Sequence, residues 1–286
     1  MNILVTGANG QLANIIKRVV ESSRNTNNSN FTFVSREDFN IVDQEAVSAY
    51  FSNHKVDAVI NCAAYTKVDL AEDEQEMAYD VNVNAVKYLA IAAESCGAEF
   101  YHVSTDFVFD GETSSHYRES HNTNPISVYG KTKLEGENAA LEFCSKTQII
   151  RTSWLYSDIA NNFVKTIIRL ASSRTELTVV ADQIGTPTSA ENLANAILNM
   201  LSSENKHYGE VYHYSDAGEC SWCEFAQEIV RLKALNCDVK PIPSEDYPQK
   251  ARRPKYSVMN KEKIVEYYSV VIFDWKLSLA KVIEKL

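Results

Sequence analysis

Hydrophobic and polar positions follow two different periods along the first half of the chain. Short runs rich in β-branched and aromatic residues predict strands at residues 3–6, 31–35, 58–61, 99–104 and 148–152. Between these runs, apolar residues recur every three or four positions and predict helices over residues 10–23, 43–51, 74–96 and 128–144. Because strands that alternate with helices are typical of βαβ units, we expect an α/β fold with a doubly wound parallel sheet covered by helices on both faces.

The alternation weakens after about residue 154. The later pattern predicts a strand over residues 177–180 and helices over residues 162–171, 190–201 and 221–235. Five of the six prolines lie at or after residue 187, whereas the first 120 residues contain none. We therefore expect a large α/β domain over residues 1–154 and a smaller, loop-rich region over 155–286, allowing for the chain crossing back between them. The polar residues 25–30 predict a surface loop.

Composition and charge exclude several classes of protein. The chain has 286 residues, of which 45% are hydrophobic, enough to bury a core. It carries 28 basic and 38 acidic residues and no long basic run, so nucleic acid is not an expected partner. No stretch approaches the roughly 20 apolar residues that span a bilayer, and the first residues lack the pattern of a secretory signal. We expect a cytoplasmic protein with no membrane partner.

The six cysteines are too few and too unevenly spaced for a disulfide framework. Cys220 and Cys223 have the spacing of a redox or metal-binding pair, but no second pair and no nearby histidine couple completes a zinc site. Ser221 and Glu224 also match a capping box at the start of a predicted helix. We interpret the two cysteines as structural residues.

The segment after the first strand predicts a dinucleotide-binding turn. Gly7 permits a tight turn, Gly10 lets the backbone approach a pyrophosphate, and the following helix offers free N–H groups at its N-terminus. The third small position of the pattern is Ala13 instead of glycine, which still permits close helix packing. The residues predicted to contact the cofactor in this turn are Gly7, Asn9, Gly10, Gln11 and Leu12.

The end of the second strand bears on the choice of cofactor. Dinucleotide-binding folds usually place an acidic residue there to hold the ribose hydroxyl, but this chain has Ser35 and Arg36. A guanidinium can pair with a 2′-phosphate, so the sequence favours NADPH, with Ser35 and Arg36 as contacts. NADH stays open as an alternative, because Glu37 or Asp38 could turn inward.

The end of the third strand predicts another wall of the cofactor site, because small side chains at the carboxyl end of a strand leave room for a ligand. The predicted wall residues are Ala63, Ala64 and Tyr65. On the following helix, Asn82 is polar in an apolar setting, and it is either an interior hydrogen-bonding brace or a solvated side chain. These features assign residues 1–154 to a Rossmann-type dinucleotide-binding domain and residues 155–286 mainly to substrate binding.

A third group of residues predicts proton transfer. Tyr129 and Lys133 lie four positions apart at the start of a predicted helix, so they project from the same face. A nearby ammonium lowers the pKa of a phenol and makes it a usable proton donor near neutral pH. Thr105, at the carboxyl end of the fourth strand, can donate a hydrogen bond to a substrate carbonyl. We predict that Tyr129 delivers a proton while hydride arrives from the cofactor, and that Lys133 tunes Tyr129 and binds the nicotinamide ribose.

These features resemble those of the dTDP-4-dehydrorhamnose reductases, a family of extended short-chain dehydrogenases. The resemblance spans nearly the whole chain, and its most specific parts are Ser-Thr-Asp at residues 104–106 and Asp-Gln-x-Gly-x-Pro-Thr at residues 182–188. The other matching segments are residues 7–12, 63–72, 107–111, 129–137, 151–156 and 253–254. The family converts dTDP-4-dehydro-L-rhamnose to dTDP-L-rhamnose with NADPH or NADH, so the resemblance implies the same reaction and a nucleotide-sugar substrate.

The resemblance also assigns roles to single residues. It implies that Thr105, Tyr129 and Lys133 are catalytic and that Thr105, Asp106 and Trp154 contact the sugar. A core aromatic at a strand end is the alternative role for Trp154.

Two positions bear on metal binding and on adenosine binding. Some members of the family dimerise through magnesium held by glutamates, and Glu191 stands at a comparable position. We predict no metal site, and magnesium and a homodimer stay open. Asn40 and Ile41 stand where relatives often have an acidic residue near the adenine, which leaves the adenosine contacts open.

Other functions remain as alternatives. The same fold includes NADP-binding regulatory subunits that can lose their catalytic residues, but Thr105, Tyr129 and Lys133 are all present here, which favours an enzyme. A nucleotide-sugar epimerase or dehydratase would use the same tyrosine and lysine and retain its NAD. The residues after Asp106 and the short second half favour a reductase, and another 4-keto deoxysugar could also be its substrate.

Overall fold

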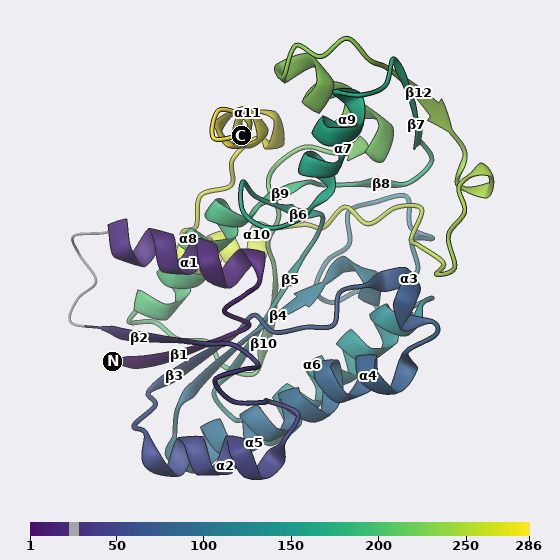
Figure 1. Ribbon diagram of the computed structural model, residues 1–286. Coiled ribbons are helices and arrows are strands. Elements are labelled where there is room, and N and C mark those ends of the chain that lie inside the picture. The colour runs from purple at the N-terminus through teal and green to yellow at the C-terminus, as the bar shows by residue number, and fades with distance from the viewer. Residues whose placement is uncertain (23–28) are drawn as a thin grey trace.

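The computed structural model describes residues 1–22 and 29–286, and its centre is a six-stranded parallel sheet (Figure 1). The strand order is β10-β5-β4-β3-β1-β2. The five strands predicted in the first half are confirmed to within one residue at each end. The strands of the sheet are β1 (Asn2–Thr6), β2 (Asn30–Val34), β3 (Ala58–Asn61), β4 (Glu99–Thr105), β5 (Thr147–Thr152) and β10 (Glu210–His213).

Helices cover both faces of this sheet, as expected for a doubly wound fold (Figure 1). Successive residues of β1 point to opposite faces, so Ile3 and Val5 pack into one hydrophobic core and Leu4 into another. The helices on the first face are α1 (Gln11–Ser22), α8 (Ala190–Ser202) and α10 (Glu262–Tyr268). Those on the second face are α2 (Gln44–Asn53), α5 (Ala85–Cys96) and α6 (Val128–Phe143). Within the described residues, no helix combines the length and the apolarity needed to cross a bilayer.

The helix predicted over residues 74–96 is divided in three. It consists of α4 (Gln75–Tyr79), a π-helical turn (Asp80–Asn84) and α5. Asn82 lies in the π-helical turn, is fully buried, and bonds to both backbone groups of Tyr65, at 2.9 Å from its N–H and 3.2 Å from its carbonyl oxygen. Of the two alternatives for Asn82, the interior brace is therefore confirmed.

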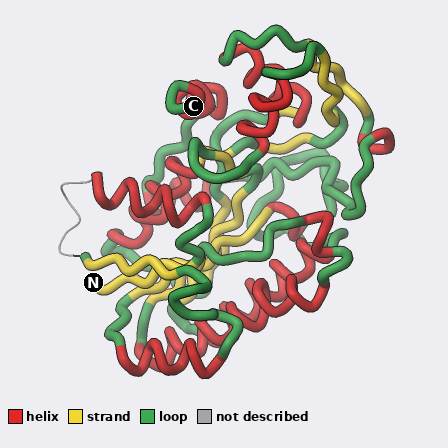
Figure 2. Tube along the Cα trace, viewed as in Figure 1, coloured by secondary structure: helices red, strands yellow, loops and turns green. Residues whose placement is uncertain are grey.

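The second half of the chain forms a smaller layer beyond the carboxyl ends of the strands, with much irregular chain (Figure 2). The capping box predicted at Ser221 and Glu224 is confirmed, and Cys220 and Cys223 are buried free thiols. A separate hydrophobic core forms around Phe225. The helices here are α7 (Phe163–Ala171), α9 (Trp222–Leu232) and α11 (Trp275–Ile283), and α3 (Val68–Ala71) lies in the first half. The short strands pair as β12 (Asp238–Ile242) with β7 (Glu176–Val180), β6 (Leu155–Tyr156) with β9 (Thr188–Ser189), and β11 (Cys220–Ser221) with β8 (Ile184–Gly185).

The chain returns from the second half to the central sheet. Strand β10, which the sequence pattern does not predict, pairs with β5 and forms an edge of the six-stranded sheet. The boundary at residue 154 stays a prediction. Most of the loop predicted over residues 25–30 lies outside the described residues, and its last residue, Asn30, begins β2.

Candidate active site

A cavity of about 530 Å³ opens beside the carboxyl ends of β1 and β3. The chain continues from β1 to β2 on one side and then to β3 on the other, so this is the point where the strand order reverses and where such sheets bind ligands. The predicted cofactor residues that line the cavity are Gly7, Asn9, Gly10, Ser35, Arg36, Ala63 and Ala64.

The turn after β1 requires glycine. Gly7 has a φ of 72°, and a Cβ atom there would lie 2.9 Å from the backbone nitrogen of Ala63. The N–H of Gly10 donates to the carbonyl oxygen of Gly7 at 2.8 Å, which closes the turn at the start of α1. A backbone without a side chain thus faces the cavity at the N-terminus of a helix, the arrangement that suits a pyrophosphate. The residues present therefore fit a dinucleotide.

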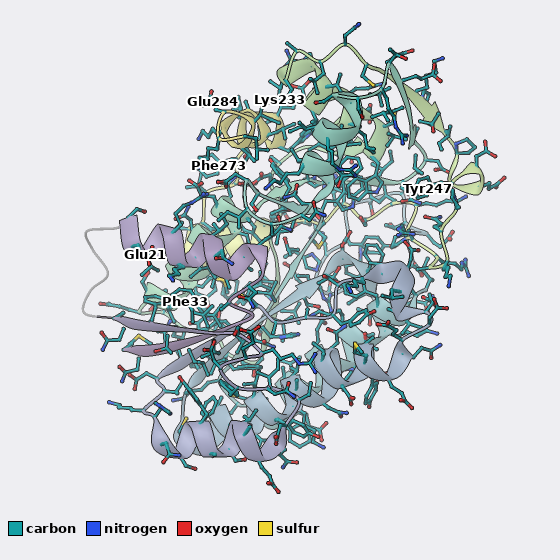
Figure 3. The ribbon with its side chains drawn as sticks, viewed as in Figure 1. Glu21, Phe33, Lys233, Tyr247, Phe273 and Glu284 are labelled. Atoms are coloured by element: carbon teal, nitrogen blue, oxygen red, sulfur yellow. The ribbon has the colours of Figure 1, made fainter. Side chains whose placement is uncertain are left out.

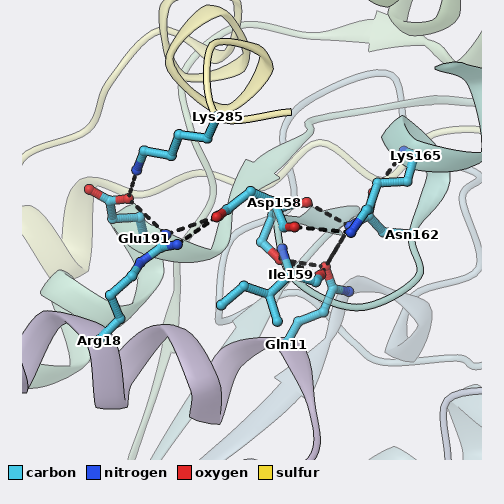
Figure 4. A network of polar contacts seen from close by, with 9 residues as sticks. Gln11, Arg18, Asp158, Ile159, Asn162, Lys165, Glu191 and Lys285 are labelled. Carbon is cyan, nitrogen blue, oxygen red and sulfur yellow. Dashed lines mark hydrogen bonds and ion pairs between the residues drawn. The ribbon is translucent and has the colours of Figure 1, made fainter.

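Three predicted cofactor residues, Gln11, Leu12 and Tyr65, do not line this cavity. The Gln11 Oε1 atom accepts hydrogen bonds from Ser157 and Asn162, each at 2.9 Å, and so connects α1 to the second half (Figure 4). Leu12 is buried in the core, and the Tyr65 hydroxyl donates to Glu74 at 2.7 Å. Contacts of Gln11 and Leu12 with a cofactor would have to come from their backbone, and these assignments stay predictions.

At the end of β2, Asp38 turns back toward Ser35. Its Oδ2 atom accepts from the Ser35 N–H at 2.7 Å and from the Ser35 hydroxyl at 2.8 Å, and these bonds lower the pKa of Asp38. Asp38 is not among the lining residues, whereas the exposed Arg36 is. Asn40 and Ile41 also line the cavity. The lining residues that the sequence analysis did not predict are Val34, Phe39, Val42, Glu76, Met77, Asp80 and Val81.

The structure brings Thr105 and Tyr129 together. The Thr105 hydroxyl donates to Asp106 Oδ1 at 3.0 Å and lies near enough to the Tyr129 phenol to affect its pKa. Phe107 meets the ring of Tyr129 edge-on, with the centroids 5.5 Å apart. Burial raises the pKa of Tyr129 to about 12; the nearby Thr105 hydroxyl lowers this pKa in part, and the charge of Asp106 raises it further. The phenol therefore holds its proton at neutral pH, as a proton donor must.

Lys133 is fully buried on the same helix, α6. Its ammonium donates to the carbonyl oxygen of Val103 at 2.7 Å and lies 3.2 Å from Nε2 of His102. Burial lowers the pKa of Lys133 to about 8, and the charge of Glu137 opposes this shift. The predicted lowering of the Tyr129 pKa is not found, because the ammonium points to these acceptors on β4 and burial dominates at the phenol.

Asp106 and Trp154 flank this edge of the sheet. Asp106 is buried, its Oδ2 atom has no hydrogen-bond partner within the described residues, and burial raises its pKa to about 6. Trp154 has a φ of 46° and stacks on Trp222 with centroids 3.6 Å apart. A Cβ atom on Gly185 would lie 2.6 Å from the Trp154 indole, so only glycine leaves room for this ring. The sugar contacts of Asp106 and Trp154 stay predictions.

A second cavity, of about 440 Å³, lies in the second half. Trp222 lines this cavity, and its ring stacks on Trp154, which follows β5. Tyr247, at the outer edge of the molecule, lies on the rim (Figure 3). Among its lining residues, the segments singled out in the sequence contribute Gln183, from residues 182–188, and Arg253. Its other lining residues include Phe163, Arg174 and Gln249.

The position of Glu191 does not fit a magnesium ion. Its carboxylate accepts from Lys285 at 2.6 Å and from Arg18 at 3.3 Å, and Arg18 also forms two bonds with Asp158 (Figure 4). The positively charged side chains of Arg18 and Lys285 thus occupy the space beside the Glu191 carboxylate where a metal ion would bind. Residues 1–22 and 29–286 contain no group of three or more histidine, cysteine, aspartate or glutamate side chains placed to hold a metal.

The parallel sheet, the glycine turn at its reversal point, and Thr105, Tyr129 and Lys133 beside the strand ends are the features of an extended short-chain dehydrogenase/reductase, an NADP-dependent oxidoreductase of nucleotide sugars. The family model described as the RmlD substrate binding domain matches residues 1–286. The chain belongs to the dTDP-4-dehydrorhamnose reductase family.

Similar proteins match almost end to end. A dTDP-4-dehydrorhamnose reductase of Aggregatibacter actinomycetemcomitans is 38% identical, over 98% of this chain and 97% of its own length. The crystal structure of a dTDP-4-dehydrorhamnose reductase of Clostridium acetobutylicum is 42% identical with a TM-score of 0.94, over 99% of both chains. That of the Bacillus anthracis enzyme, in complex with NADP, is 35% identical with a TM-score of 0.93, over 100% of this chain and 99% of that one.

Proposed function

We propose that this chain reduces the 4-keto group of dTDP-4-dehydro-L-rhamnose to give dTDP-L-rhamnose, with Thr105, Tyr129 and Lys133 as its catalytic residues. The observation that carries the assignment of these residues is the position of the Thr105 hydroxyl beside the Tyr129 phenol at the sheet edge, near enough to affect the pKa of the phenol. Two hydroxyl groups there can share one carbonyl oxygen. NADPH bound in the 530 Å³ cavity supplies the hydride.

Thr105, Tyr129 and Lys133 each have a separate role in the reduction. Thr105 donates a hydrogen bond to the keto oxygen as negative charge develops, and Tyr129 transfers its phenolic proton to that oxygen. Lys133 directs two N–H groups of its ammonium to Val103 and His102 and holds the ribose of the cofactor with the third. Because the pKa of Tyr129 is raised, the proton is on the phenol before each turnover.

The 440 Å³ cavity is the site we assign to the nucleotide part of the substrate. Phe163, Trp222 and Tyr247 offer aromatic faces for a base, and Arg174 can pair with a diphosphate. The Arg253 guanidinium bonds to Asp69 Oδ1 at 3.1 Å, and this bond joins the cavity wall to the helix after β3. Trp154 stacks on Trp222 and follows Thr152, which pairs with Thr105, so we place the sugar between this cavity and Thr105.

The direct test is the loss of NADPH absorbance when the purified protein is mixed with dTDP-4-dehydro-L-rhamnose, with dTDP-L-rhamnose identified as the product. We expect turnover. A protein that oxidises neither NADPH nor NADH with this substrate would overturn the assignment, and a protein that purifies with tightly held NAD would indicate an epimerase or dehydratase instead.

We also infer that the enzyme prefers NADPH and works in the cytoplasm. Arg36 supports the preference, because it lines the cavity while Asp38 is engaged with Ser35. Replacing Arg36 by alanine should raise the KM for NADPH about tenfold, the effect of losing roughly 1.4 kcal/mol from one exposed charge-assisted contact, and leave the KM for NADH unchanged. Arg118→Ala, a change at an exposed arginine outside the cavity, serves as the control in the same steady-state assay. Equal effects on both cofactors would contradict this role.

A further inference from the structure

A row of polar side chains crosses the interior of the sheet beneath the catalytic edge. Thr6 on β1, Asn61 on β3 and His102 on β4 are paired in register, and each is 1% exposed or less. The Thr6 hydroxyl lies 2.6 Å from Asn61 Oδ1, Asn61 Nδ2 lies 3.0 Å from His102 Nδ1, and His102 Nε2 lies 3.2 Å from the Lys133 ammonium. Inner strands of parallel sheets are normally apolar, so this row requires a physical reason.

Burial dictates the charge of His102. The pKa of the ring is lowered well below its ordinary value, first by burial and then by the charge of Lys133. A neutral imidazole has one nitrogen that donates and one that accepts, whereas an ammonium only donates. A charged Lys133 therefore needs Nε2 of His102 as an acceptor, and the ring proton must then lie on Nδ1.

The ring proton on Nδ1 needs an acceptor of its own. The structure places the amide nitrogen of Asn61 toward Nδ1 of His102, while the amide oxygen accepts from the Thr6 hydroxyl and, at 3.3 Å, from the Ala63 N–H. When the amide is turned over, its oxygen accepts from Nδ1 of the ring, and the Ala63 N–H keeps the Thr6 hydroxyl oxygen, at 3.3 Å, as its acceptor. The opposite orientation of the amide places the ring proton on Nε2 and requires an uncharged Lys133. The row thus couples the direction of one buried amide to the charge of the catalytic lysine.

We propose that His102 is a positioning residue of the reductase, which accepts a hydrogen bond from the Lys133 ammonium while Thr6 and Asn61 hold its ring in the accepting tautomer. The proposal rests on the catalytic role assigned to Lys133. Val103 and His102 occupy two of the three ammonium N–H groups and leave one for the ligand. Because Thr6, Asn61 and His102 are all buried, the row orients the lysine and does not carry protons to solvent.

The kinetic test compares His102→Phe, which keeps a flat ring but has no acceptor, with His102→Gln, whose amide oxygen can accept. Lys133 is faced by Glu137 on its own helix, Cys62 after β3 and His102 on β4. Without the acceptor the ammonium is less stable, so in His102→Phe the alkaline limb of kcat should move to lower pH than in the wild type. We expect kcat to fall about 100-fold, as for a catalytic group displaced by roughly 1 Å, with little change in the substrate KM.

The controls separate positioning from packing. His102→Gln should recover most of kcat, and His213→Gln, at a second fully buried histidine outside the row, should keep the wild-type pH profile. An unchanged profile in His102→Phe, an alkaline limb that moves upward, or a glutamine variant no better than the phenylalanine variant would overturn the proposal. Turnover by the wild type is the separate check on the proposed function.

A measurement on the wild-type protein does not depend on any variant being active. In ¹⁵N-histidine-labelled protein, with the His102 signals assigned from their loss in His102→Gln, the ring nitrogen shifts report which nitrogen carries the proton. We expect the proton on Nδ1 at neutral pH. A proton on Nε2 would mean that the ring donates to an uncharged lysine, and the proposal would then be wrong even if every variant lost activity.

Discussion

Replacing Tyr129 by phenylalanine is expected to lower kcat by roughly 10²- to 10⁴-fold, the range for loss of a positioned proton donor. The change removes only the hydroxyl beside Thr105, and the edge-on contact of the ring with Phe107 remains. The fold and the cofactor cavity should therefore be preserved. The measurement is NADPH oxidation at saturating substrate, together with NADPH binding followed by fluorescence, which should change by less than about threefold.

Tyr267→Phe removes an exposed hydroxyl on α10 and is the matched control, with wild-type kcat expected. If Tyr129→Phe kept more than a third of the wild-type rate, the proton would have to come from another group. Asp106 would then be the first to examine, because it is buried beside Thr105 and its pKa is raised to about 6.

The second large effect concerns stability. Glu137 and Arg151 form an ion pair beneath the active site, with Nη2 2.7 Å from Oε2 and Nε 2.9 Å from Oε1, and the Ser104 hydroxyl also donates to this carboxylate. Their side chains are only 2% and 5% exposed. Glu137→Gln leaves the guanidinium buried without a compensating charge, so we expect the free energy of unfolding to fall by about 3–5 kcal/mol in urea denaturation.

The matched control is Glu176→Gln, which removes one partner of the pair with Lys240 at the surface, where both side chains are 51% exposed. Solvent screens that pair, so its loss should cost less than about 1 kcal/mol. Equal losses in the free energy of unfolding would show that the buried Glu137–Arg151 pair stabilises the fold no more than the exposed pair does.

The strands of the first half could be predicted because of how deeply they are buried. All four residues of β3 and all six of β5 are buried, and each strand contains adjacent β-branched apolar residues, Val59 and Ile60 in β3 and Ile149 and Ile150 in β5. Strand β10 gave no such signal, because Glu210 is exposed and the strand exists only through its pairing with β5. The sequence pattern also did not predict β12, which contains Pro241; a two-stranded sheet tolerates proline because its strands are edges.

In the candidate active site, too, features set by local sequence spacing were predictable, and contacts between distant segments were not. The spacing of Tyr129 and Lys133 on one helix was visible in the sequence, as was the position of Thr105 at the end of a strand. The direction of the Lys133 ammonium was not, because its acceptors come from β4. A polar residue inside an otherwise buried strand, such as His102 next to Tyr101, was the available signal for the row that supports Lys133.

The late return of the chain to its central sheet has a consequence for synthesis on the ribosome. Strand β5 is complete at Thr152, but its outer edge is unpaired until β10 ends at His213. At about 5–20 residues per second, that interval lasts roughly 3–12 seconds. During that time the nascent chain carries an open strand edge to which a neighbouring chain can pair. Slow translation between these residues should therefore lower the yield of folded enzyme more than slow translation after residue 213.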